Sequence, residues 1–183
     1  MDDKREKHIS KFMSLILRHK AVEMGIPIDS EGWCIVSLVR DAMSQSNVTL
    51  SEMKEVVDNS TKQRFSFRAY DQSIRANQGH SLEGVSIKFE TRTPPDYLYH
   101  GTSFSKKDTI WKDGVKAMSR NLVHVCDTES LAFKVGSRHG KPFIFKVNAK
   151  QMVCDGISFY ISTNKVWLVD YIDPKYLEEH YVY

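Results

Sequence analysis

Arginine and histidine residues recur in three short motifs along this chain. Arg18-His19 ends a helix-like run, Arg75-Ala-Asn-Gln-Gly-His-Ser81 lies in the middle, and Ser137-Arg-His-Gly140 lies toward the end. An arginine guanidinium presents a rigid fork of N–H donors that matches a phosphate group, and a histidine can also transfer a proton near neutral pH. We therefore expect these motifs to gather into one phosphate-binding site.

A fourth motif, Leu98-Tyr-His-Gly-Thr102, lies between the second and the third. A strand ending in His100-Gly101-Thr102 lets a ligand approach the backbone closely at the glycine, with polar side chains on either side. Each motif alone has a simpler explanation: a basic helix end, a polar hairpin end, a strand-terminal histidine or a glycine helix cap. Their combination in one chain favours a functional site.

The composition is that of an ordinary globular protein. The chain has 183 residues, 41% hydrophobic and 27% charged, with a net charge of +3. This charge permits a nucleic-acid partner without requiring one. The three cysteines are far apart and form no CxxC pair, so we expect a reducing compartment, cytoplasmic or nuclear, and no metal site. No segment approaches the length needed to span a membrane.

The first half predicts three helices followed by a hairpin. Helices are expected over residues 8–20, 35–42 and 50–57, the last capped by Thr49 or Ser51, and strands over 64–69 and 74–77. This order is typical of a winged helix, a common nucleic-acid module. Thr93-Pro-Pro95 excludes regular pairing and predicts a domain boundary, so that the first lobe covers residues 1–93.

The second half, residues 94–183, predicts a mixed lobe and makes the whole chain α+β. Helices are expected over 104–112 and 128–136, and strands over 97–100, 122–126, 142–148, 157–162 and 165–169, before a turn at 173–176 and a short acidic tail.

The sequence resembles the RNA 2′-phosphotransferases, which complete tRNA splicing, over nearly its whole length. The resembling segments are Ser10–His19, Ile28–Trp33, Arg64–Ser66, Ile74–Ser81, Leu98–Thr102, Met118–Arg120 with Val123–Val125, and Ser137–Gly140. The resemblance implies a winged-helix RNA-binding lobe and an NAD-binding lobe similar to ADP-ribosyltransferases.

The resemblance also implies an activity and its site residues. The family removes an internal RNA 2′-phosphate in an NAD-dependent reaction, through an RNA whose 2′-phosphate carries ADP-ribose. The products are RNA with a 2′-OH, nicotinamide and ADP-ribose 1″,2″-cyclic phosphate. The implied catalytic residues are Arg18, His19, Arg75 and Arg138. The implied substrate-binding residues are Gln78, His80 and Ser81, and the implied NAD-binding residues are His100, Gly101, Thr102, Arg120 and His124.

Two positions qualify this assignment. Arg120 rivals Arg138 as the fourth catalytic arginine. Cys126 stands where related sequences usually carry serine after the Val-His segment, and a thiol donates a hydrogen bond only weakly.

Two other classes of protein stay open on the residues alone. One is a winged-helix binding protein whose second lobe has lost catalysis, although His100, Thr102 and His124 are all present. The other is an ADP-ribosyltransferase acting on proteins or nucleic-acid ends. Such enzymes usually place an activating carboxylate late in the lobe, where this chain has only Glu178 and Glu179. The expected partners are tRNA or another RNA with an internal 2′-phosphate, and NAD, and the chain is expected to be a monomer.

Overall fold

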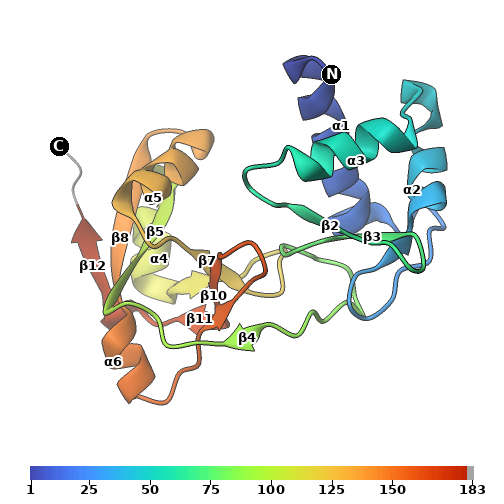
Figure 1. Ribbon diagram of the computed structural model, residues 1–183. Helices are drawn as coiled ribbons and strands as arrows, with labels where there is room; N and C mark the ends of the chain where they lie inside the picture. The colour runs from blue at the N-terminus through green and yellow to red at the C-terminus, as the bar shows by residue number, and fades with distance from the viewer. Residues whose placement is uncertain (181–183) are drawn as a thin grey trace. The chain divides into compact units, whose positions relative to one another are not determined.

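The computed structural model describes residues 1–180, apart from the side chain of residue 139. The protein is a mixed α and β structure that divides into two compact units, one covering Met1–Lys88 and the other starting at Phe89 (Figure 1). Each unit has its own cluster of buried apolar side chains.

The N-terminal unit contains three helices and a three-stranded antiparallel sheet. Its helices are α1 (Asp3–Leu15), α2 (Val36–Ala42) and α3 (Leu50–Asp58), with a π-helical turn η1 (Ile16–Lys20) after α1 and a 3₁₀ turn η2 (Ser44–Ser46) after α2. Its strands are β1 (Cys34–Ile35), β2 (Phe65–Arg68) and β3 (Ser73–Ala76), in the order β1-β3-β2.

Polar caps decide where two of these helices begin. The Asp2 side chain accepts a hydrogen bond from the Arg5 amide and caps α1. The helix therefore starts at residue 3, five residues before the expected start at residue 8. At α3, Thr49 and Glu52 form a reciprocal capping box, which confirms Thr49 as the cap. Each of these helices therefore begins at a residue that satisfies otherwise unpaired amide groups.

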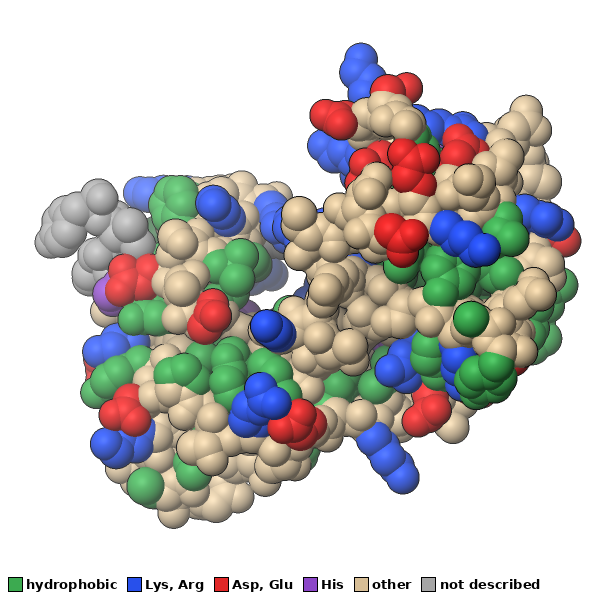
Figure 2. All heavy atoms as spheres, in the orientation of Figure 1, with side chains coloured by type: hydrophobic (Ala, Val, Ile, Leu, Met, Phe, Trp, Pro, Cys, Tyr) green, Lys and Arg blue, Asp and Glu red, His purple; other side chains and the backbone are tan. Residues whose placement is uncertain are grey.

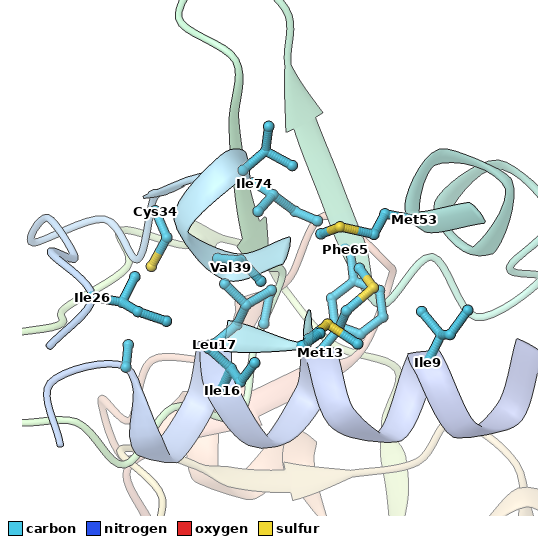
Figure 3. Close-up of a cluster of buried hydrophobic side chains, with 14 of the residues drawn as sticks. Ile9, Met13, Ile16, Leu17, Ile26, Cys34, Val39, Met53, Phe65 and Ile74 are labelled. Carbon is cyan, nitrogen blue, oxygen red and sulfur yellow. The ribbon is translucent and has the colours of Figure 1, made fainter. Parts of the chain in front are cut away.

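The core of this unit lies between α1 and the β2–β3 hairpin. Ile9, Met13, Ile16 and Leu17 line one side of α1 and η1, and Phe65 and Ile74 of the hairpin belong to the same buried cluster (Figure 3). Burying an aliphatic side chain of this size contributes about 1.5–3 kcal/mol. The alternation along the hairpin leaves Ser66, Arg68 and Arg75 on its opposite, polar face.

The second unit is built around a three-stranded antiparallel sheet with the order β12-β8-β5. These strands are β5 (Tyr97–Ser103), β8 (Pro142–Asn148) and β12 (Leu177–His180). A second sheet has the order β4-β9-β10-β7, and β6 pairs with β11. The shorter strands are β4 (Glu90–Thr91), β6 (Val115–Lys116), β7 (Val123–Val125), β9 (Tyr160–Ile161), β10 (Trp167–Val169) and β11 (Tyr171–Ile172).

Helices join and cover these strands. The helices are α4 (Lys107–Asp113), α5 (Glu129–Gly136) and α6 (Ala149–Cys154), with 3₁₀ turns η3 (Phe104–Lys106), η4 (Ser137–His139) and η5 (Pro174–Tyr176). The α6 helix was not expected from the sequence, and it starts where the Asn148 side chain accepts a hydrogen bond from the Gln151 amide. The expected acidic tail is also wrong for residues 177–180, because they form β12 against β8 and bury Leu177.

Charge is spread rather than concentrated on the face of the molecule shown in Figure 2. Lysine and arginine side chains are interspersed there with aspartate and glutamate. Within the described residues, no helix is long and apolar enough to cross a membrane.

Candidate functional site

Arg18 and His19 lie on the π-helical turn that follows α1. Ile16 and Leu17, just before them, are fully buried, whereas Arg18 is half-buried and His19 is exposed. The two apolar residues anchor the turn in the core. Arg18 and His19 follow them and are more exposed. A π-helical turn is rare in proteins and often marks a functional site.

The segment after β3 lies against this turn. The Ser81 amide donates to the Arg18 carbonyl at 3.0 Å, and Nδ1 of His19 lies 2.8 Å from the Ser81 hydroxyl. A Cβ atom on Gly79 would lie 3.7 Å from Cδ of Arg18, and Gly79 has a φ of +86° that favours glycine. Arg18 and His19 of the first motif therefore meet Gly79 and Ser81 of the second.

Asn77 anchors the start of this segment. Its side chain is buried, donates to the Gln63 carbonyl at 2.6 Å and accepts from the Ser66 hydroxyl at 2.7 Å. A buried amide with both ends satisfied holds its backbone firmly. The chain then leads into Gln78, which is half-buried.

His80 is the most deeply buried histidine of this cluster, with 3% of its surface exposed. Burial, and after it the charges of Arg18, Arg75 and His19, lower the pKa of His80 from 6.5 to about 4. The ring is therefore neutral at physiological pH. Its Nε2 is buried and has no hydrogen-bond partner within residues 1–180.

Arg75 projects from β3 close to the turn Asp29–Trp33. Its Nη1 donates to the Glu31 carbonyl at 3.3 Å, and its guanidinium carbon lies 4.5 Å from the centre of the Trp33 ring. Burial lowers the pKa of Arg75, and the carboxylates of Glu31 and Asp29 oppose that shift. Arg75 nevertheless remains a cation, because an arginine pKa starts far above neutrality.

The charges of this cluster suit an anion. Arg18, Arg75 and His19 all act on His80, so positive charge is concentrated around one neutral, hydrogen-bonding ring. A phosphate group would relieve the repulsion between the cations and accept hydrogen bonds from guanidinium N–H groups. Arg18, His19, Arg75 and His80 together form what we call the basic cluster.

In the C-terminal unit, His100, Gly101 and Thr102 lie near the end of β5. A Cβ atom on Gly101 would overlap the Ala132 carbonyl oxygen, so the glycine lets α5 pack directly on the strand. Nδ1 of His100 lies 3.3 Å from the His124 carbonyl oxygen, and burial lowers the pKa of His100. A neutral ring that donates from Nδ1 presents Nε2 as an acceptor, which fits a ribose hydroxyl.

Arg120, His124 and Arg138 belong to the same unit. Nη1 of Arg120 forms a hydrogen bond with Nδ1 of His124. The pKa of Arg120 is lowered, first because surrounding atoms exclude water from the guanidinium and then by the charge of Arg138. Arg138 lies on η4 and is exposed. The two rival arginines therefore act on each other electrostatically, and both remain candidates.

Cys126 is joined to β5 by two backbone hydrogen bonds with Tyr99. Its amide donates to the Tyr99 carbonyl at 2.7 Å, and the Tyr99 amide donates back at 2.8 Å. Burial, with a smaller contribution from the charge of Asp127, raises the pKa of the Cys126 thiol to about 11. The thiol is therefore protonated, and it is at best a weak hydrogen-bond donor to a ligand.

The structure thus places the expected site residues in two groups, one in each unit. Reasoning from the sequence assigned no role to Trp33 or Gly32, although both approach the basic cluster: a Cβ atom on Gly32 would lie 2.8 Å from Nε2 of His80. The segment Ile28–Trp33 was only part of the family resemblance. No group of three or more His, Cys, Asp or Glu residues suited to a metal ion occurs in the described part of the chain.

The comparisons with known proteins agree on one family. The model of the family "RNA 2′-phosphotransferase, Tpt1 / KptA family" matches residues 4–171. A protein of Nostoc punctiforme named "Probable RNA 2′-phosphotransferase" is 43% identical, over 98% of this chain and 99% of its own. Proteins of the same name from Hahella chejuensis and Escherichia coli strain HS are 42% and 41% identical; the matches cover 96% and 97% of this chain and 95% and 97% of theirs.

The chain therefore belongs to the RNA 2′-phosphotransferase family, as the motifs predicted. It is a transferase whose general activity is the removal of a 2′-phosphate from RNA.

Proposed function

We propose that this protein removes an internal 2′-phosphate from RNA in a reaction that consumes NAD, with the splice junction of a tRNA as the substrate class. The observation that carries the proposal is the basic cluster, in which two arginines and two histidines from η1, β3 and the following segment converge. The family membership supports the same activity.

The unit Met1–Lys88 is the RNA lobe in this proposal. Its three helices followed by a β-hairpin have the order of a winged helix. Arg18 and Arg75 bind the 2′-phosphate through their guanidinium forks, and His80, Gln78 and Ser81 contribute neutral hydrogen bonds. His19, held by the Ser81 hydroxyl at 2.8 Å, protonates the leaving RNA oxygen.

The unit from Phe89 onward is the NAD lobe, similar to an ADP-ribosyltransferase. The neutral His100 ring, with Nδ1 donating to a backbone carbonyl, accepts a hydrogen bond from a ribose hydroxyl. Gly101 and Thr102 line the same strand end, and Arg120 and His124 bind further along the dinucleotide. Arg138 is assigned to the reacting phosphate as the fourth catalytic arginine.

The chemistry proceeds in two displacements. An oxygen of the RNA 2′-phosphate forms a bond to C1″ of the NAD ribose, and the C1″–nitrogen bond breaks to release nicotinamide. The 2″-hydroxyl then loses its proton and its oxygen bonds to phosphorus, while the bond from phosphorus to the RNA O2′ breaks. The O2′ takes up a proton, so the step has no net gain or loss of protons. The phosphate nucleophile is already ionised near neutral pH, so the first step requires positioning more than a strong base.

One assay tests this proposal. The protein is incubated with an RNA that bears one internal 2′-phosphate, with and without NAD, and the RNA and small products are analysed by mass spectrometry. We expect loss of the 2′-phosphate and formation of ADP-ribose 1″,2″-cyclic phosphate only when NAD is present. Release of inorganic phosphate without NAD would overturn the proposal. Stable ADP-ribose on the end of a 5′-phosphorylated control RNA would instead support an end-modifying transferase.

A further inference from the structure

Trp33 carries two arginine side chains on its ring. The guanidinium carbons of Arg68 and Arg75 lie 4.4 Å and 4.5 Å from the centre of the indole. The sheet brings these residues together, because Trp33 precedes β1 and Cys34 of that strand pairs with Ile74, the neighbour of Arg75. The three side chains therefore lie on the polar face of one sheet.

The two arginines are held in different ways. Arg68 forms an ion pair with Asp71 at 2.5 Å and donates to the Ser73 hydroxyl at 3.1 Å. In the part of the chain that the structure describes, no carboxylate forms an ion pair with Arg75, and its Nε is buried without a hydrogen-bond partner. Apart from one 3.3 Å hydrogen bond to the Glu31 carbonyl, stacking on Trp33 is what holds the Arg75 guanidinium.

Trp33 itself is fixed by the turn that precedes it. Its amide donates to the Asp29 carboxylate at 2.8 Å, and its carbonyl accepts from the Asp29 amide at 3.0 Å. The Glu31 amide donates to the same carboxylate at 2.9 Å. The backbone that carries the indole is therefore held in place by contacts that involve neither arginine.

We propose that Trp33 is a positioning residue that holds the Arg75 guanidinium for the 2′-phosphate, an inference that rests on the proposed function. The negative face of an indole attracts a guanidinium and offsets the repulsion between the neighbouring charges of Arg68 and Arg75. Stacking uses the flat face of the guanidinium and leaves its N–H edge available to a phosphate. The ring thereby fixes the plane of the Arg75 guanidinium. Unlike a carboxylate, it does not neutralise the positive charge.

The test compares Trp33→Leu, which removes the ring face, with Trp33→Phe, which keeps one. Tyr70→Leu is the matched control: Tyr70 is 83% exposed and stacks on Arg68 at 5.1 Å, and it is not placed against Arg75. For each protein we would measure the affinity for an oligonucleotide with one internal 2′-phosphate and for the same oligonucleotide with a 2′-OH, in the absence of NAD. Circular dichroism and urea unfolding check that each variant is folded.

We expect Trp33→Leu to lose about tenfold of the preference for the 2′-phosphate, because a desolvated cation–π contact of this kind is worth roughly that factor. Trp33→Phe should keep most of the preference and Tyr70→Leu all of it. If Trp33→Leu does not fold, Trp33→Met takes its place as a variant of similar length without a ring. A folded Trp33→Leu or Trp33→Met protein with the wild-type preference would overturn the inference.

The same variants separate this inference from the proposed function. With NAD present, Trp33→Leu should slow 2′-phosphate removal, and Arg75→Lys should make the further effect of Trp33→Leu small, because both changes act on one guanidinium. Failure of the wild-type protein to consume NAD would overturn the proposed reaction. The affinity ratios measured without NAD would still decide the role of Trp33.

Discussion

At the scale of single residues, the protonation state of His80 follows from its surroundings. The ring is 3% exposed, and the charges of Arg18, Arg75 and His19 act on it, so both its burial and its neighbours penalise a second proton on the ring. A neutral histidine can donate or accept a hydrogen bond without adding charge to the basic cluster. In the proposed function, this would allow the basic cluster to recognise a phosphate by geometry as well as by charge.

The buried His80 predicts a loss of stability in mild acid. The folded pKa of about 4 lies below the unfolded value of 6.5, so the unfolded state binds more protons between these values and stability falls as the pH falls through this window. The full effect is at most about 3–4 kcal/mol, because the pKa falls from 6.5 to about 4 and each pKa unit corresponds to about 1.4 kcal/mol. Urea unfolding of wild type and His80→Gln at pH 7.5 and pH 4.5 measures it. Equal pH dependence in both proteins would show that His80 is not the source.

A second prediction concerns the proposed catalytic residues. Arg18→Ala, His19→Ala, Arg75→Ala and Arg138→Ala should each lose activity severely, roughly 100-fold or more, while staying folded. Replacing each arginine by lysine should not restore full activity, because the two-pronged guanidinium contact is lost. Single-turnover rates on 2′-phosphorylated RNA provide the measurement. An inactive Arg120→Ala together with an active Arg138→Ala would show that Arg120 is the fourth catalytic arginine.

The two chemical steps should respond differently to these changes. The first step mainly requires the phosphate to be positioned, whereas the second requires stabilised charge at phosphorus and a proton for the leaving oxygen. At least one of Arg18→Ala, His19→Ala and Arg75→Ala should therefore accumulate RNA that carries ADP-ribose on its 2′-phosphate. Gel mobility and mass spectrometry detect this adduct. Unmodified 2′-phosphorylated RNA in every variant would contradict the division of labour between the steps.

At the scale of the elements, the contact between β5 and α5 determines the position of His100 and Thr102. The strand and the helix touch at Gly101, where any side chain would overlap the Ala132 backbone. Gly136, at the end of α5, makes a second close approach, since a Cβ atom there would lie 2.6 Å from the Thr102 carbonyl oxygen. Two glycines thus set the strand end against the helix that leads to Arg138.

Gly101→Ala should therefore destabilise the C-terminal unit by more than about 2 kcal/mol, because the backbone of α5 must move to make room. Gly156→Ala, in the same unit, is a suitable comparison: its site is open, and its φ of +86° alone should cost about 1 kcal/mol. Urea unfolding of the two variants and the wild type provides the measurement. Similar losses in both would mean that α5 adjusts easily to the added methyl group.

At the scale of the whole molecule, the proposed reaction needs an RNA and NAD but no metal ion. We expect activity to survive EDTA and to vanish when NAD is omitted, because the expected site residues are arginines and histidines with no cluster of carboxylates or thiolates among the described residues. Turnover rates with and without chelator, each with and without NAD, check this expectation. Strong inhibition by EDTA that Mg²⁺ reverses would contradict it.

The sequence by itself determined the family and the kinds of residue at the site. The motifs and their order can be read directly from the sequence, and the family comparison confirms the family that they indicated. Helix periodicity and the alternation in residues 64–69 predicted α1, α2, α3 and the β2–β3 hairpin, because these patterns depend only on neighbours along the chain. Local patterns did not predict elements that are stabilised by residues far away in the sequence. An example is β12, which forms by pairing with β8.

Only the tertiary structure decided which distant residues touch. Gly32 and His80 are separated by 48 positions, 80 minus 32, yet a Cβ atom on Gly32 would lie 2.8 Å from the His80 ring. The low pKa of His80 and the stacking of Arg75 on Trp33 arise in the same way. Such contacts depend on how apolar faces pack and on which strands pair. The spacing of residues along the chain records neither of these, so the sequence indicates the candidate site residues but not the contacts that position them.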